Sequence, residues 1–205
     1  MKKIALFLII ALFASELSFG QFALGLRVGY SGNKLTTNID SIKSQFNNGF
    51  HVGVWARLGK KLYFAPEFLY NMSGGVFTSE GNVSAKDWQQ KIKIGSIDIP
   101  LLVGYKIIHT DILTWRIELG PEGSFAVNKK ISEMNSVTGP VTTSNIQTAN
   151  WYILAGTGID VLFLRLDVRY QYGLNEMIKD VQDYSLNSKN SMFVVSVGFK
   201  IFGGK

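Results

Sequence analysis

The stretch FLRLDVRYQYGL, residues 163–174, alternates apolar and polar side chains along almost its whole length. In an extended chain, successive side chains point to opposite faces of the strand. One face of this stretch is apolar and holds Leu164, Leu166, Val168, Tyr170 and Tyr172. The opposite face is polar and holds Arg165, Asp167, Arg169 and Gln171. The pattern therefore predicts a β-strand that separates an apolar environment from a polar one.

The same two-residue period recurs along the chain. The alternating segments are residues 22–31, 49–58, 62–72, 96–107, 114–125, 150–161, 163–174 and 192–202. Long gaps rich in Asn, Ser and Thr, at residues 32–48, 73–95, 126–149 and 175–191, alternate with short gaps at residues 59–61, 108–113 and near Leu162. Connections of alternating length are typical of an up-and-down barrel with short turns at one end and long loops at the other. The sequence therefore predicts an all-β fold, an eight-stranded antiparallel up-and-down β-barrel.

Two kinds of barrel fit this pattern: a soluble barrel with an apolar interior and a membrane barrel with an apolar exterior. The interior of an eight-stranded barrel is only just filled by side chains. The apolar faces carry mostly large residues, whereas the polar faces carry Gly25, Gly29, Gly53, Gly104, Gly120, Gly156, Gly158, Gly173 and Gly198. Because small residues belong where space is short, we expect the polar face inside and a transmembrane barrel. Aromatic residues near the long gaps are predicted to form an interfacial girdle: Tyr30, Phe50, Tyr70, Trp151, Tyr170 and Tyr172.

The first twenty residues have the layout of a secretory signal peptide. Lys2 and Lys3 precede an apolar run at residues 4–14, and Ser18 and Gly20 precede Gln21. The apolar run is too short for a comfortable membrane span. We therefore expect residues 1–20 to be a signal peptide and residues 21–205 to form the barrel domain, with an uncleaved anchor as the alternative. Export with a barrel fold predicts the outer membrane of a Gram-negative envelope.

The composition excludes several classes of function. The chain has no cysteine, so it has no disulfide framework and no thiolate metal site. Its formal net charge is +6, but the basic residues are scattered rather than clustered as nucleic-acid binding requires. We expect no nucleic-acid partner, no cofactor and no metal.

Charged residues on the polar faces are predicted to form a lumen charge network. They are Arg27, Arg57, Glu67, Asp98, Lys106, Arg116, Glu118, Glu122, Asp160, Arg165, Asp167, Arg169 and Lys200. In a narrow lumen such groups must pair or keep water, because an isolated buried charge is costly. We expect Lys200 and Arg27 to be neighbours where the last strand meets the first. Glu118, Glu122 and Asp160 are the expected counter-charges, and the network is either an ion-pair plug or a path for ions or protons.

A hydrolase site would need a serine, a histidine and an acid that orients the histidine. The chain has two histidines, His51 and His109. We expect His51 inside the barrel and His109 in a short turn, neither with a serine on the same face of a neighbouring strand. The sequence therefore predicts a protein that is not an enzyme.

Five motifs of the chain resemble the PorT-like outer-membrane β-barrel family of Bacteroidetes, which is also labelled a porin family. They are YFAPEFLYN (63–71), IDIPLLVGYK (97–106), LGPEGSF (119–125), DVRYQYGLN (167–175) and VGFKIF (197–202). The resemblance spans nearly all of residues 21–205. It implies an eight-stranded outer-membrane barrel but no shared activity, and some members resemble a component of protein secretion.

These observations favour a non-enzymatic integral outer-membrane protein with a charge-plugged lumen and external loops for envelope or partner interaction. Its expected partners are outer-membrane lipid, including lipopolysaccharide, and an envelope protein that the sequence does not name. The alternatives are a narrow pore for ions or very small solutes and an accessory component of a protein-secretion machine. The oligomeric state is left open by the sequence.

The sequence predicts that the mature protein starts at Gln21 and fractionates with outer membranes. N-terminal sequencing tests the first expectation, and membrane fractionation tests the second. On a gel, the detergent-solubilised protein should migrate differently with and without boiling, because a closed barrel resists unfolding by detergent. Recovery as a soluble periplasmic protein would contradict the membrane barrel.

Overall fold

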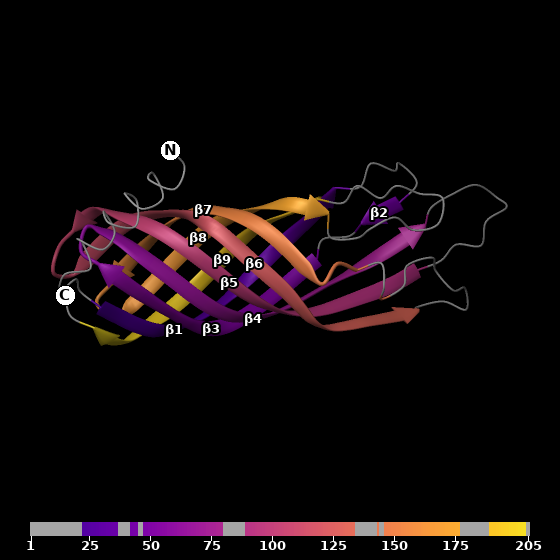
Figure 1. Ribbon diagram of the computed structural model, residues 1–205, viewed down its shortest axis with the longest axis horizontal. Helices are drawn as coiled ribbons and strands as arrows, with labels where there is room; N and C mark the ends of the chain where they lie inside the picture. Colours follow the sequence, from indigo (N-terminus) through magenta and orange to yellow (C-terminus); the bar gives the residue numbers. More distant parts are fainter. Residues whose placement is uncertain are drawn as a thin grey trace, which may run out of the picture.

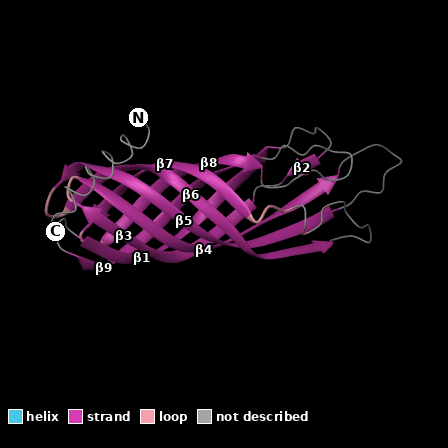
Figure 2. Ribbon diagram, in the orientation of Figure 1, coloured by secondary structure: helices cyan, strands magenta, loops and turns pink. Residues whose placement is uncertain are grey.

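The computed structural model describes residues 22–36, 42–44, 47–79, 89–133, 143, 146–176 and 189–203. These residues form strands joined by short loops (Figure 2). Among them, no helix is long and apolar enough to cross a membrane. The predicted signal peptide lies outside the described residues.

The strands are β1 (Phe22–Thr36), β2 (Ile42–Ser44), β3 (Asn47–Gly59), β4 (Leu62–Ser79), β5 (Gln89–His109), β6 (Leu113–Glu133), β7 (Ala149–Val161), β8 (Leu164–Glu176) and β9 (Lys189–Gly203). Their order around the sheet is β2-β4-β3-β1-β9-β8-β7-β6-β5, and pairing of β4 with β5 closes the ring. Every strand pair is antiparallel, and the three-residue β2 attaches to the far end of β4 (Figure 1). The prediction of an eight-stranded antiparallel up-and-down barrel is confirmed.

The three short connections lie together at one end of the barrel (Figure 1). They join β3 to β4, β5 to β6, and β7 to β8. The last is a two-residue turn in which Leu162 has a φ of 54°, in the left-handed region. Where β3 runs into the β3–β4 turn, the residue with a positive φ is Gly59, at 125°, which has no side chain to clash with the backbone.

The long gaps are shorter than the sequence predicts. β4 continues to Ser79, β5 begins at Gln89 and β6 continues to Glu133, so three strands extend beyond the barrel (Figure 1). In these extensions apolar side chains of β5 face inward and its lysines face outward, the reverse of the arrangement in the barrel. A pattern of outward apolar residues therefore does not predict them. Ile92 and Ile94 face inward and are buried, while Lys91 and Lys93 are exposed.

The predicted orientation of the two faces is confirmed. Leu166 and Val168 are 51% and 50% exposed, whereas Arg165 and Asp167, between and beside them, are each 1% exposed. Large exposed apolar side chains continue around the whole barrel, far beyond the patches that soluble monomers tolerate. The six girdle aromatics are exposed on this outer surface. The outer surface is therefore suited to lipid.

Placing an arginine halfway along the outward row of β8 should destabilise the barrel. We expect Val168→Arg to cost about 2–4 kcal/mol in free energy of unfolding, because the guanidinium would lie in hydrocarbon. Equilibrium denaturation of the protein refolded into lipid vesicles measures this cost.

Ile112→Arg is the matched control. Ile112 is 65% exposed, but it lies in the β5–β6 turn, where the cost should fall to about 0–1 kcal/mol. Equal costs for the two variants would mean that lipid does not cover the outer surface of β8.

Candidate functional site

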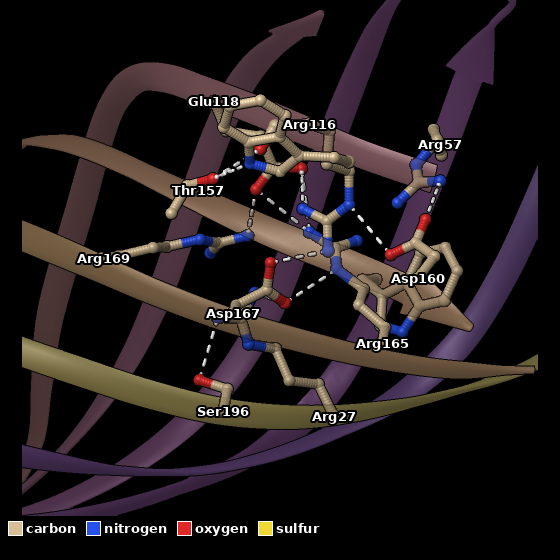
Figure 3. A network of polar contacts seen from close by, with 12 residues as sticks. Arg27, Arg57, Arg116, Glu118, Thr157, Asp160, Arg165, Asp167, Arg169 and Ser196 are labelled. Atoms are coloured by element: carbon tan, nitrogen blue, oxygen red, sulfur yellow. Dashed lines mark hydrogen bonds and ion pairs between the residues drawn. The ribbon is translucent and has the colours of Figure 1, made fainter. Parts of the chain in front are cut away.

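The lumen contains a central charge network built by alternate strands of the barrel. Its members are Arg27 on β1, Glu67 on β4, Arg116 and Glu118 on β6, and Arg165, Asp167 and Arg169 on β8. All seven are buried, with exposures between 0% and 5%. Figure 3 shows several of these side chains converging from their strands toward the barrel axis.

β7, which lies between β6 and β8, carries glycines at the same level. On β7, Gly158 pairs with Arg116 on one side and Asp167 on the other, and Gly156 pairs in the same way with Glu118 and Arg169. A Cβ atom at Gly158 would collide with both Arg116 and Asp167. Because glycine has no side chain, the charged side chains of β6 and β8 can contact each other across β7. Arg116 Nη2 lies 2.7 Å from Asp167 Oδ1, and Arg169 Nη2 lies 2.7 Å from Glu118 Oε2.

Glu67 ties three strands together. Arg27 Nη1 donates to both oxygens of Glu67, at 2.8 and 2.9 Å. Arg169, from the opposite side of the barrel, donates to both oxygens with Nη1 at 2.9 Å and Nη2 at 2.8 Å. The pair with Arg169 is bidentate, which is the strongest and most directional form of carboxylate recognition.

Glu118 and Asp167 are also bound by several donors. Arg165 donates to Glu118 at 2.9 Å, and the Tyr63 hydroxyl donates to the same oxygen at 2.9 Å. Asp167 accepts from Arg165 Nε at 2.8 Å and lies 3.6 Å from Arg27 Nη1. Every carboxylate of the central network thus contacts at least two arginines.

Two aromatic rings pack against arginine guanidinium groups in the lumen. The Arg165 guanidinium lies 4.8 Å from the centroid of the Trp55 ring, and the Arg57 guanidinium lies 4.8 Å from that of Tyr63. Both distances fall within the range of cation–π attraction. Trp55 also donates through Nε1 to the Leu26 carbonyl at 3.0 Å, so its ring is held in place.

A second group of charges lies toward the short turns. Asp160 accepts from Arg57 Nη1 at 2.7 Å and from Arg116 Nε at 2.9 Å, which connects it to the central network. Arg57, Asp160, Lys106 and Lys200 line a cavity of about 80 Å³ together with turn residues such as Asp111.

A third group lies toward the long loops. Asp98 accepts from Ser96 at 2.7 Å and from Ser124, and Gln171 donates to Glu122. A cavity of about 10 Å³ lies beside Asp98, room for about one water molecule.

The predicted lumen charges therefore form a central network with a further group toward each end of the barrel, and Asp160 links the turn-side group to the network. Asp160 and Lys200 are partly exposed, and the others are buried. Two expected contacts are wrong. Gly198, not Lys200, pairs with Arg27, which donates instead to Ser196 at 2.9 Å. Glu122 is expected to pair with the lumen cations, but it accepts a hydrogen bond from Gln171. Glu67 is the carboxylate that pairs with Arg27 and Arg169.

Sequence reasoning also missed Tyr63 as a member of the site. Its ring fits inside because the residue opposite on β5 is Gly104, where a Cβ would collide with the Tyr63 ring. A glycine at the matching position of a neighbouring strand is the signal that could have found it.

The residues opposite His51 on its two neighbouring strands are Gly29 and Asn71, but a serine reaches it from β9, one strand farther on. His51 Nε2 lies 3.1 Å from Ser196 Oγ, across Gly29 of the strand between them. Among the described residues, no carboxylate forms a hydrogen bond with His51, and Arg27 also holds the Ser196 hydroxyl. His51 and Ser196 are 4% and 1% exposed, so the pair lacks both an orienting acid and access for a substrate.

His109 is the last residue of β5, and its Nδ1 lies 2.8 Å from the Thr114 hydroxyl. Within the described part of the chain, no group of three or more His, Asp or Glu residues could hold a metal ion.

Residues 13–179 match the family model described as outer membrane protein beta-barrel domain. The chain belongs to this family. Family and fold together place it in the outer membrane. No curated protein matches the chain.

Several solved protein structures are similar to this chain. Ail, the attachment invasion locus protein of Yersinia pestis, solved with the heparin analogue sucrose octasulfate, is 10% identical, with 89% of this chain and 100% of that chain covered and a TM-score of 0.44. OprG from Pseudomonas aeruginosa is 12% identical, with 90% and 94% covered and a TM-score of 0.48. Neisserial surface protein A is 15% identical, with 87% and 97% covered and a TM-score of 0.44. Identities this low say nothing about a shared ligand.

Removing one carboxylate from the central network should leave buried cations without a partner. We expect Glu118→Ala to lower the free energy of unfolding by about 3–5 kcal/mol, because Arg165 and Arg169 lose an acceptor in a site closed to water. Denaturant titration of the refolded protein measures the change.

Asp111→Ala removes a carboxylate from the exposed β5–β6 turn and should cost about 0–1 kcal/mol. A cost for Glu118→Ala as small as this control would indicate a hydrated lumen.

Proposed function

We propose that this protein is a non-enzymatic outer-membrane barrel with a plugged lumen, which acts through the surfaces at its long-loop end. The observation that carries the proposal is the position of the central charge network between two separate cavities. The cavity of about 80 Å³ lies at the short turns, and that of about 10 Å³ lies toward the long loops. Glu67, Glu118, Asp167 and their arginines fill the space between.

The energetics of this network argue against the alternative of a narrow pore. An ion crossing the lumen would have to displace carboxylates from arginines that are almost fully buried. Leaving such a charge unpaired costs several kcal/mol. A barrel whose interior is committed to ion pairs offers its outer parts, rather than its lumen, for interaction with the envelope or a partner.

Two further parts of the proposal rest on the sequence. The motifs that resemble the PorT-like family support a place in that branch, and a role as an accessory component of a secretion machine rests on this resemblance alone. Copurification of secretion proteins from native membranes would be its test. The proposal includes export by a cleaved signal peptide at residues 1–20.

We expect the wild-type protein to show no stable single-channel steps in a planar lipid bilayer. The double variant Glu67→Ala/Arg169→Ala removes one negative and one positive side chain from the plug, so net charge is unchanged while space opens. Conducting steps should appear in this variant if it refolds.

The matched control is Lys60→Ala/Asp111→Ala, which removes one charge of each sign from the short turns and should stay silent. Reproducible steps from the wild type would overturn the plug and favour the pore, whether or not the double variant folds.

A further inference from the structure

Where β5 and β6 extend beyond the barrel, their outward face carries three exposed lysines. These lysines take no part in the charge pairing of the lumen. Lys93 on β5 pairs directly with Lys130 on β6, and Lys91 pairs with Ser132, two residues along the same face. Side chains directly opposite in an antiparallel pair lie about 5 Å apart at Cβ, and diagonal ones about 7–8 Å apart. Lys91, Lys93 and Lys130 therefore form one cluster, here called the lysine patch.

None of the residues paired directly with the lysine patch carries a negative charge. Gly74 and Val76 on β4 lie opposite Lys93 and Lys91, and Asn128 is the next outward residue of β6. None of the three lysines forms an ion pair with a described residue. Like charges directly opposite in a sheet are destabilising. The repulsion between these lysines is relieved when an anion binds between them.

The patch begins where the apolar outer surface of the same strands ends. Tyr70, opposite Ile97, is 40% exposed, and its hydroxyl reaches over Gly95, two residues before Ile97. From Ile97 to Lys93 is four residues, about 13 Å along the strand, or about 10 Å along the membrane normal at the usual tilt. A lysine side chain can bend back over part of that distance. This spacing puts the ammonium groups of Lys93 and Lys130 at the level of lipid headgroups, with Lys91 two residues farther out along β5.

The end of the barrel that carries the patch is opposite the short turns (Figure 1). In outer-membrane barrels the long-loop end faces the cell exterior. We propose that Lys91, Lys93 and Lys130 bind the phosphate groups of the phosphorylated glycolipid in the outer leaflet. Lysine ammonium groups are compact point charges that suit phosphate oxygens. This inference rests on the proposed function, because it assumes that the long-loop end faces outward.

The test compares two variants of the refolded full-length protein, each with two lysines replaced. Lys93→Gln/Lys130→Gln breaks the directly opposed pair of the patch. Lys60→Gln/Lys61→Gln removes the same charge from the exposed β3–β4 turn at the other end. Binding of lipid A with its phosphates to the detergent-solubilised protein is measured by native mass spectrometry, and heat-modifiability on a gel shows that each variant is folded.

We expect the patch variant to bind phosphorylated lipid A about thirtyfold more weakly than the wild type, and the turn variant to bind within about twofold. Lipid A stripped of phosphate should bind wild type and patch variant alike, and millimolar inorganic phosphate should not displace the lipid. Equal weakening by both variants, no weakening by either, or displacement by free phosphate would each overturn the proposal. A conducting wild-type barrel would overturn the plug while leaving these results unchanged, so the two proposals fail separately.

Discussion

The contact of Glu67 with Arg27 and Arg169 joins β1, β4 and β8 across the lumen, and the rest of the interior is arranged around it. A carboxylate that is 3% exposed needs donors on every open side. Two guanidinium groups supply four hydrogen bonds to its two oxygens. Each of those arginines must then be neutralised in turn, and Glu118 and Asp167 do so.

This requirement accounts for the alternation of strands from β6 through β8 to β1. β1, β4, β6 and β8 bring large charged side chains to the centre, while β7 and β9 bring Gly156, Gly158 and Gly198 to the same level. Side chains from alternate strands can then form a layer in a barrel too narrow for eight large residues at one height. The outer surface is free of this constraint and carries large apolar residues on every barrel strand.

The fold could be predicted from the sequence because the two-residue period is local and repeats along the chain. The direction of each face also followed, since glycines and charges shared one face and bulky residues the other. The pairing of individual charges could not be predicted, because it depends on how neighbouring strands are aligned. Bulges between Leu24 and Gly25 and between Lys106 and Ile108 shift that alignment by amounts that the sequence pattern does not encode. In the observed alignment Arg27 lies opposite Gly198 and donates to Ser196 and Glu67, while Lys200 lies opposite Gly25.

The extension of β4, β5 and β6 shows the same limit from another side. Its inward isoleucines and outward lysines are a regular strand pattern, but one suited to water outside rather than lipid. The outward residues of β5 are apolar in the barrel and charged in the extension. A rule that expects only apolar outward residues therefore finds one part of β5 and misses the other.

The arrangement of the central network has a consequence for how the barrel is assembled. Among its seven residues, each ion pair between strands joins strands that are not hydrogen-bonded neighbours. A hairpin therefore forms none of these pairs. In a sheet that has not yet curled, β1 and β4 can meet over β3, and β6 and β8 can meet over β7, but β8 cannot reach β1 or β4. Dehydration of the interior, and the ion pairs that join β8 to β1 and β4, await the meeting of β1 with β9. Closure of the cylinder and drying of its interior are thus one cooperative step, and a partly assembled barrel has no stable dry form.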